Sequence, residues 1–196
     1  MTIHEYGTEH EKVIVLVHPS VVMWDFFEYV IPLLEKQYHL IIPALPGYDE
    51  ENPQEDFTSV EKIAEDLEKR CIERKLTTID LLYGCSMGGS VVLRMLADRK
   101  LVIKNTICDG GITPYQLPWL VTRLLAVRDF LMILMGKIGG LGLLERARDM
   151  EYVKKHFPAV EFVKQENMGH AGMAALQPDK MAAAMKELLE TGSDAV

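Results

Sequence analysis

The sequence predicts an α/β fold, a three-layer sandwich in which an open, mainly parallel sheet is flanked by helices on both faces. Short apolar runs rich in β-branched residues recur along the chain, and helical patterns lie between them. Such alternation implies right-handed crossovers between parallel strands. The 196 residues show neither an internal repeat nor a low-complexity linker, so we expect a single domain over 1–196.

The first apolar run, 13–18, is continuous, as is typical of a strand buried on both faces of a parallel sheet. We therefore expect it to be a central strand. Similar runs predict four further strands, at 39–45, 78–83, 103–108 and 160–164.

Helices are predicted between these strands. Residues 59–75 place apolar side chains at i, i+3 and i+4 spacing with charged residues between them, which indicates a helix with one apolar face. Helical patterns also cover 24–36 and 87–98, and a further helix over 151–157 ends before Pro158. Because sites in parallel α/β sheets form at the carboxyl ends of strands, functional residues are expected just after each strand.

The segment 112–144 interrupts this alternation and is strongly apolar, with many leucines and a glycine-rich patch. It is predicted to be a helical lid insertion, with a pair of ordinary core helices as the alternative. A bilayer span needs about twenty mainly apolar residues. Four charged residues interrupt the segment too often for that, namely Arg123, Arg128, Asp129 and Lys137.

Charge and cysteine content exclude several classes of protein. A formal net charge of −8 and a pI near 5.3 argue against nucleic-acid binding, which depends on clustered Lys and Arg. Three cysteines without a CxxC pair fit neither a disulfide framework nor a zinc site, which favours a reducing compartment. The N-terminal residues show no secretory signal, and a cytoplasmic location is expected.

The motif G-x-S-x-G at 84–88 follows the predicted strand 78–83 and precedes the predicted helix. In this motif a sharp strand-to-helix turn holds the serine in a strained conformation with its Oγ exposed. Gly84 and Gly88 provide the space that the neighbouring backbone requires. Ser86 is therefore the candidate nucleophile, and it would gain from the positive end of the helix dipole as charge develops on oxygen.

A serine hydroxyl needs a base within hydrogen-bond reach, and histidine suits this role best. His170 lies in a glycine-flanked loop after the last predicted strand and before a final helix. That position places it at the same edge of the sheet as Ser86. Four other histidines are expected at the surface, namely His4, His10, His39 and His156.

Acyl transfer also needs hydrogen-bond donors for the oxyanion. One is expected from the residue after the nucleophile, the N–H of Met87, and another from the loop after the first central strand. Pro19 has no N–H, so Ser20 is the favoured donor in that loop and Val21 the alternative. The side chain of His18 is expected to be buried and bonded to loop backbone.

These features together resemble the α/β-hydrolase superfamily, in particular its small bacterial members, over nearly the whole chain. Matching features are the strand ending in His18, Trp24 at the start of the next helix, the run Ile41 to Tyr48, the motif at 84–89, Asp109-Gly110-Gly111 and Met168-Gly169-His170. The resemblance implies the three-layer fold and a Ser-His-acid triad.

Two features depart from the family pattern. His18-Pro19 replaces the common His-Gly after the first central strand, and the usual acid-bearing strand between the lid and the helix near Glu145 is missing. Some lipases of the superfamily instead carry the acid directly after the strand that follows the elbow helix, where this chain has Asp109. The resemblance therefore favours Asp109, with Glu145 and Asp149 as reserves; alternatively, Asp109 only shapes its loop.

The sequence as a whole predicts an esterase that hydrolyses a small or medium apolar ester through an acyl-enzyme on Ser86, with no metal or organic cofactor. The same triad serves amide, peptide and carbon–carbon bond hydrolysis, so these reactions remain open. A non-catalytic binding protein that has lost the triad acid is the alternative from another class. A missing strand would also leave a sheet edge free to pair with a second copy, which makes a homodimer a further hypothesis.

Overall fold

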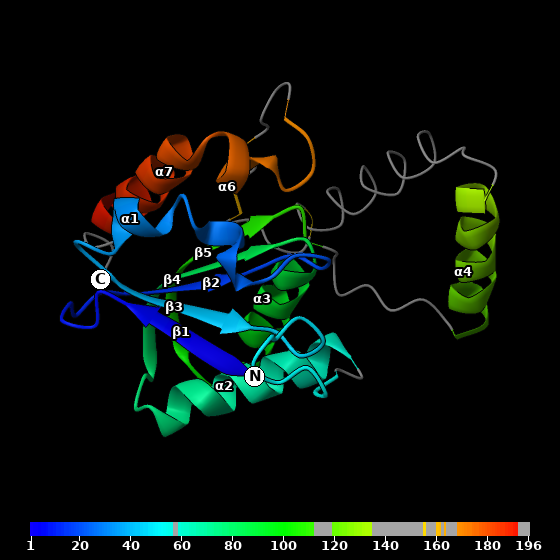
Figure 1. The fold of residues 1–196 in the computed structure, drawn as a ribbon, viewed down its shortest axis with the longest axis horizontal. Coiled ribbons are helices and arrows are strands. Elements are labelled where there is room, and N and C mark those ends of the chain that lie inside the picture. Colours follow the sequence, from blue (N-terminus) through cyan, green and yellow to red (C-terminus); the bar gives the residue numbers. More distant parts are fainter. Residues whose placement is uncertain are drawn as a thin grey trace. The chain divides into compact units, whose positions relative to one another are not determined.

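The computed structural model describes residues 1–56, 59–111, 119–134, 155, 160–161, 163 and 168–191. The chain divides into two compact units, one made of Met1–Ile112 with Glu166–Val196 and the other of Thr113–Gln165. The first unit contains the sheet (Figure 1). In the second, helix α4 (Trp119–Leu134) falls inside the predicted lid segment. The role of that segment as a lid stays a prediction.

The sheet has five strands in the order β1-β3-β2-β4-β5. Strands β2 (Val13–Val17), β3 (His39–Ala44), β4 (Thr78–Cys85) and β5 (Val102–Asp109) are parallel and confirm four of the predicted strands. All five residues of β2 are buried, and β2 lies in the middle of the order. The predicted central strand is therefore confirmed.

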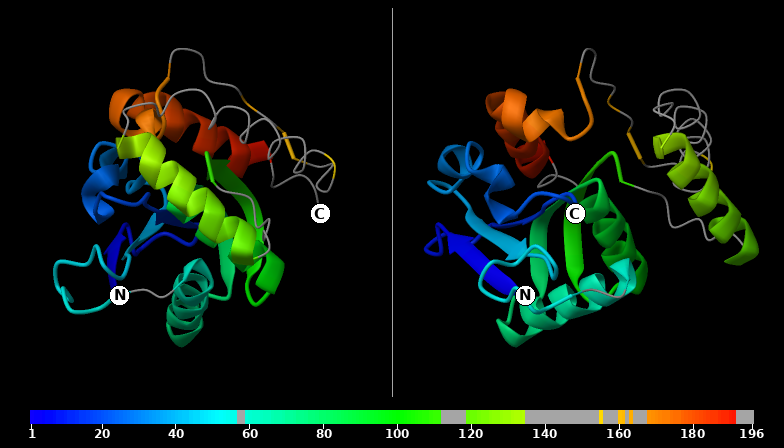
Figure 2. Two further views of the ribbon diagram at one scale, coloured as in Figure 1. Left: turned by 90° about the vertical axis from the view of Figure 1, so that its right-hand side faces the viewer. Right: turned by 45° about the vertical axis from the view of Figure 1, so that its right-hand side comes forward.

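Helices cover both faces of the sheet, which confirms the three-layer arrangement (Figure 2). Along β2, Ile14 and Leu16 face one apolar cluster, whereas Val15 and Val17 face the other. The second cluster is completed by α2 (Val60–Glu73) and α3 (Met87–Asp98). The first is completed by the 3₁₀-helix η1 (Trp24–Phe27), α1 (Ile31–Leu34), α6 (Gly172–Leu176) and α7 (Pro178–Thr191).

Helices α2 and α3 match the predicted helices 59–75 and 87–98. The side chain of Ser59 accepts the N–H of Lys62 at 3.2 Å and so caps the first turn of α2. The continuous helix predicted over 24–36 is wrong, since η1 and α1 are separate short helices. Proline favours the first turn of a helix because it lacks an N–H, and Pro32 stands in the first turn of α1.

Two strand predictions differ from the structure. Strand β1 (Thr2–Tyr6) was not expected, and it pairs antiparallel with β3 at the edge of the sheet. In the segment 160–164, the described residues Val160, Glu161 and Val163 do not lie in a strand. The rest of that segment lies outside the described residues, as does all of the predicted helix 151–157 except Lys155.

None of the described helices is long and apolar enough to cross a membrane.

Candidate active site

Ser86 lies at the turn between β4 and α3 with φ 52° and ψ −113°, a backbone conformation that non-glycine residues rarely adopt. The turn is tight because two glycines leave room for it. A β-carbon on Gly84 would stand 2.3 Å from the carbonyl oxygen of Gly88, a contact that no side chain tolerates. The strand, strained serine and helix predicted from the sequence are therefore all present.

The first turn of α3 packs directly on the carboxyl end of β2. A β-carbon on Gly88 would stand 2.2 Å from the carbonyl oxygen of Val17 and 2.8 Å from that of His18. This close approach brings Met87, the residue before Gly88, to the side of the loop that starts at His18. Met87 and Ser20, the two predicted oxyanion donors, thus belong to elements in direct contact.

The His18 side chain is fully buried and bonded to backbone at both ring nitrogens. Its Nε2 accepts the N–H of Leu45 at 3.1 Å, so the ring proton is on Nδ1, which donates to the carbonyl oxygen of Pro19 at 2.8 Å. Burial lowers the pKa of His18 below its usual 6.5. The neutral ring therefore joins the 18–21 loop to the loop after β3, and its expected structural role is confirmed.

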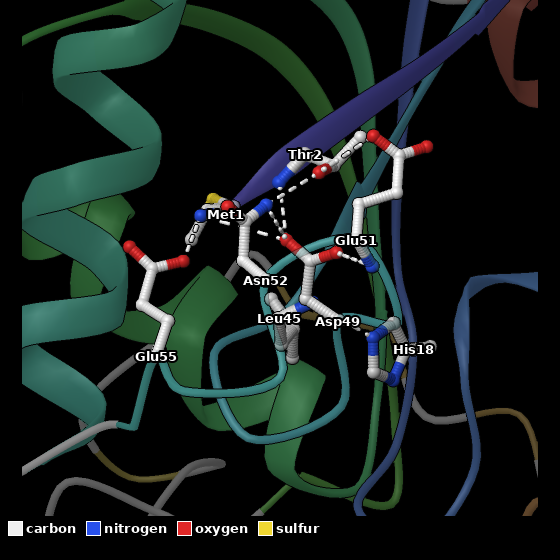
Figure 3. Close-up of polar contacts among 8 residues, drawn as sticks. All are labelled: Met1, Thr2, His18, Leu45, Asp49, Glu51, Asn52 and Glu55. Atoms are coloured by element: carbon white, nitrogen blue, oxygen red, sulfur yellow. Dashed lines mark hydrogen bonds and ion pairs between the residues drawn. The ribbon is translucent and has the colours of Figure 1, made fainter.

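Asp49 anchors the loop after β3 (Figure 3). Its carboxylate accepts the N–H of Thr2 at 2.7 Å, the N–H of Glu51 at 3.0 Å and the side-chain amide of Asn52 at 2.9 Å. Burial alone would raise the pKa of Asp49, but these hydrogen bonds outweigh it and lower the pKa to about 2. The loop after β3, which bonds His18 through Leu45, is thus tied to the edge strand β1.

Asp109 ends β5 beside the serine turn. Its carbonyl oxygen accepts the N–H of Ser86 at 2.9 Å, and its Oδ2 accepts the hydroxyl hydrogen of Tyr83 at 2.9 Å. Asp109 pairs with Cys85 in the register of β4 and β5. The carboxylate therefore points to the sheet face that carries Tyr83, the face covered by α6 and α7.

His170 reaches the carboxyl end of β5 from the loop before α6. A β-carbon on Gly110 would stand 3.1 Å from Cε1 and 3.2 Å from Nδ1 of the His170 ring. The next residue, Ala171, packs on the cluster that contains Tyr83, so the loop arrives on the face to which Asp109 points. Within the described residues, no hydrogen bond joins His170 to Asp109.

The structure thus brings Ser86, Asp109 and His170 to one edge of the sheet, at the ends of β4 and β5. The reserve acids Glu145 and Asp149 lie outside the described residues. Among the residues that the structure describes, no group of three or more His, Cys, Asp or Glu side chains could hold a metal ion.

The thiol next to Ser86 does not compete as a nucleophile. Burial, followed by the charge of Asp109, raises the pKa of Cys85 to about 12. Because a thiol attacks as its thiolate, Cys85 is inert at neutral pH.

Sequence reasoning gave Tyr83 and Gly110 no role at the site, and it named Val21 only as the alternative oxyanion donor. Tyr83 was read only as the end of a strand, although a tyrosine in a buried run needs a partner for its hydroxyl. Gly110 was noted only as part of a motif. Val21 has φ 63° and is 87% exposed, and nothing in a β-branched residue signals that conformation.

A sequence profile of the alpha/beta hydrolase family matches residues 14–191, and the chain belongs to this family. No curated protein sequence matches it significantly. Among solved structures, it is similar to an alpha/beta hydrolase family protein from Desulfitobacterium hafniense, with 21% identity and a TM-score of 0.67 over 96% of this chain and 100% of that one. This likeness shows the fold.

Larger hydrolases match over part of their length. A meta-cleavage product hydrolase from Pseudomonas fluorescens shares 17% identity with a TM-score of 0.50, over 60% of this chain and 44% of that one. An esterase from Exiguobacterium antarcticum shares 25% identity with a TM-score of 0.48, over 56% of this chain and 40% of that one. The chain thus spans less than half the length of these two enzymes.

Proposed function

We propose that this protein is a serine hydrolase that cleaves carboxylic esters through an acyl-enzyme on Ser86. The observation that carries the proposal is the strained backbone of Ser86 at a strand-to-helix turn, with φ 52° and two close-packed glycines. Such strain is stored where a side chain must be held exposed for chemistry. Membership of the alpha/beta hydrolase family and the nearness of His170 support the same reading.

In the proposed reaction, Ser86 Oγ attacks the ester carbonyl carbon while Nε2 of His170 takes the hydroxyl proton. The N–H groups of Met87 and Ser20 hold the oxyanion, and the tetrahedral intermediate collapses as His170 gives its proton to the leaving alcohol. A water molecule then attacks the acyl carbon, again giving its proton to His170. The acid is released when that proton returns to Ser86 Oγ.

Asp109 is our proposed triad acid. Its carboxylate points to the sheet face from which the His170 loop arrives. The next residue, Gly110, lies beside the His170 ring, so that a β-carbon there would stand 3.2 Å from Nδ1. An acid at Nδ1 orients the imidazole and stabilises the imidazolium that forms during attack. Glu145 and Asp149 stay as alternatives.

We further propose that the apolar segment 112–144 contributes to binding the substrate's acyl chain. The proposal rests on composition, because this segment is strongly apolar and rich in leucine. We propose that the substrate is hydrophobic and that the protein is cytoplasmic.

Mass spectrometry after treatment with a fluorophosphonate tests the nucleophile. We expect one adduct, on Ser86, in the folded wild-type protein and none in Ser86→Ala. No adduct on the folded wild type would contradict the proposal. It would favour the non-catalytic binding protein, an alternative supported by the missing hydrogen bond between Asp109 and His170 in the described residues.

The leaving group needs a separate test, because fluorophosphonates label esterases and peptidases alike. Initial rates on p-nitrophenyl esters of two to eight acyl carbons should exceed those on amino-acid anilides. Faster turnover of anilides would overturn the esterase assignment and leave the serine hydrolase assignment intact.

A further inference from the structure

Tyr83 is a buried tyrosine whose hydroxyl reaches from β4 to the end of the neighbouring strand. Its side chain is 1% exposed, and its hydroxyl donates to Asp109 Oδ2 at 2.9 Å. In the sheet register Tyr83 pairs with Ile107, and Asp109 lies two residues further along β5 on the same face. The hydroxyl therefore reaches diagonally along the strands toward the catalytic edge.

Packing fixes the position of this hydroxyl. The Tyr83 ring meets Phe27 edge to face, with centroids 5.8 Å apart and planes at 83°, inside the cluster under α6 and α7. Burial, followed by the charge of Asp109, raises the pKa of Tyr83 above its usual 10. The phenol thus stays protonated and remains a donor throughout the working range of pH.

Asp109 is consequently held at two points. Its backbone oxygen accepts the N–H of Ser86 at 2.9 Å, while its carboxylate accepts the hydroxyl of Tyr83. A carboxylate offers about four lone-pair sites, so this bond leaves capacity for the Nδ1–H of His170. An acid fixed in this way does not have to reorient when the imidazolium forms. That is the advantage of a preorganised site.

From this arrangement we infer that Tyr83 is a positioning residue, which holds the Asp109 carboxylate ready for His170 and so sets the reactivity of Ser86. The inference rests on the proposed serine hydrolase function with Asp109 as the acid. Tyr83 acts through Asp109 and touches no reacting atom.

Tyr83→Phe removes the hydroxyl and keeps the ring that packs on Phe27. We expect kcat on a p-nitrophenyl ester to fall about ten- to a hundredfold, with KM within about twofold, since misplacing a catalytic group costs rate more than binding. The rate of fluorophosphonate labelling at Ser86 should fall by a similar factor. Tyr38→Phe is the matched control because it removes a hydroxyl from another buried tyrosine of the same cluster, 6% exposed.

Asp109→Asn supplies the second arm. If Tyr83 acts through Asp109, Asp109→Asn lowers kcat at least as far as Tyr83→Phe, and the double variant is no slower than Asp109→Asn alone. Thermal unfolding of each variant accompanies the kinetics, so that rates are compared at a temperature where all are folded. A purely structural Tyr83 would lower stability without this dependence on Asp109.

The outcomes separate the two proposals. The positioning role would be overturned if the wild type takes the fluorophosphonate label but the kcat of Tyr83→Phe equals that of Tyr38→Phe. The serine hydrolase proposal would survive that result. The same holds if the losses from Tyr83→Phe and Asp109→Asn multiply in the double variant. Folded wild type that neither takes the label nor hydrolyses esters would overturn both.

Discussion

The ring of His170 lies against the α-carbon of Gly110, so closely that a methyl group there would stand 3.1 Å from Cε1 and 3.2 Å from Nδ1. Gly110 also has φ 62°, a conformation that side chains disfavour. The residue after Asp109 is therefore a glycine for two separate reasons. This approach brings the end of β5 next to the loop that carries the proposed base.

Gly110→Ala should consequently displace His170. We expect kcat/KM on p-nitrophenyl esters to fall at least tenfold, together with a loss of about 1 kcal/mol in stability from the left-handed backbone. The control is Gly169→Ala, because a β-carbon there has no atom within 4 Å. Equal activities in the two variants would show that Gly110 does not position His170.

The fold was largely predictable because its inner strands are continuous apolar runs. Ile14, Leu40 and Leu81 are fully buried in strands covered on both sides, and such runs stand out in a sequence. Strand β1 was missed because it lies at the edge with His4 and Glu5 only partly buried or exposed. Its polar residues give no apolar pattern in the sequence, and its pairing with β3 depends on tertiary contacts.

The candidate site was predictable where real strands lead into it. Ser86 follows β4 and Asp109 ends β5, and the carboxyl ends of parallel strands share an edge. His170 was placed at this edge from the run 160–164, whose described residues do not lie in a strand, so topology does not account for its position. The contact between Tyr83 and Asp109 could not be predicted, since it depends on the exact register of β4 and β5. A one-residue shift would turn the Asp109 carboxylate to the opposite face.

Val21→Gly should stabilise the protein. Val21 is β-branched at φ 63°, and at 87% exposure its side chain gains little from burial. Glycine relieves the backbone strain, and this gain outweighs the extra entropy of the unfolded chain. We expect the free energy of unfolding in urea to rise by about 0.5–1 kcal/mol. Val21→Ala keeps a β-carbon and should therefore raise the free energy of unfolding by less. A glycine variant less stable than the alanine variant would contradict this account of the loop.

Asp49→Asn should destabilise the protein at neutral pH and leave it nearly unaffected in acid. The folded pKa of about 2 lies below the usual 3.8, so the ionised carboxylate stabilises the fold above about pH 4. The shift corresponds to about 2 kcal/mol, which is lost as the pH falls toward 2.

Urea unfolding of wild type and Asp49→Asn from pH 7 to pH 2.5 measures this difference. Glu50→Gln is the control, because Glu50 is an exposed carboxylate on the same loop. A deficit for Asp49→Asn that is equally large at pH 7 and pH 2.5 would refute the role of the ionised carboxylate, and a deficit shared by Glu50→Gln would show that it is not specific to Asp49.

His18 should make the stability of the protein depend on pH in a different range. Its Nε2 accepts the N–H of Leu45. Protonation of Nε2 would place two buried N–H donors face to face, which breaks this hydrogen bond. Because burial lowers the folded pKa below 6.5, the unfolded chain binds the proton more readily than the folded one. The contribution of His18 is therefore complete above pH 6.5 and decreases as the pH falls below it, by up to about 1.4 kcal/mol per pH unit.

His18→Asn separates this effect from the other histidines. Asparagine can still accept and donate hydrogen bonds, but it does not titrate. We expect the variant to be less stable at pH 7.5 by about 1–3 kcal/mol, because a buried network is disturbed, and its stability to fall less steeply than that of wild type between pH 6.5 and pH 5. Parallel slopes for the two proteins in urea unfolding would mean that His18 is not the group that titrates.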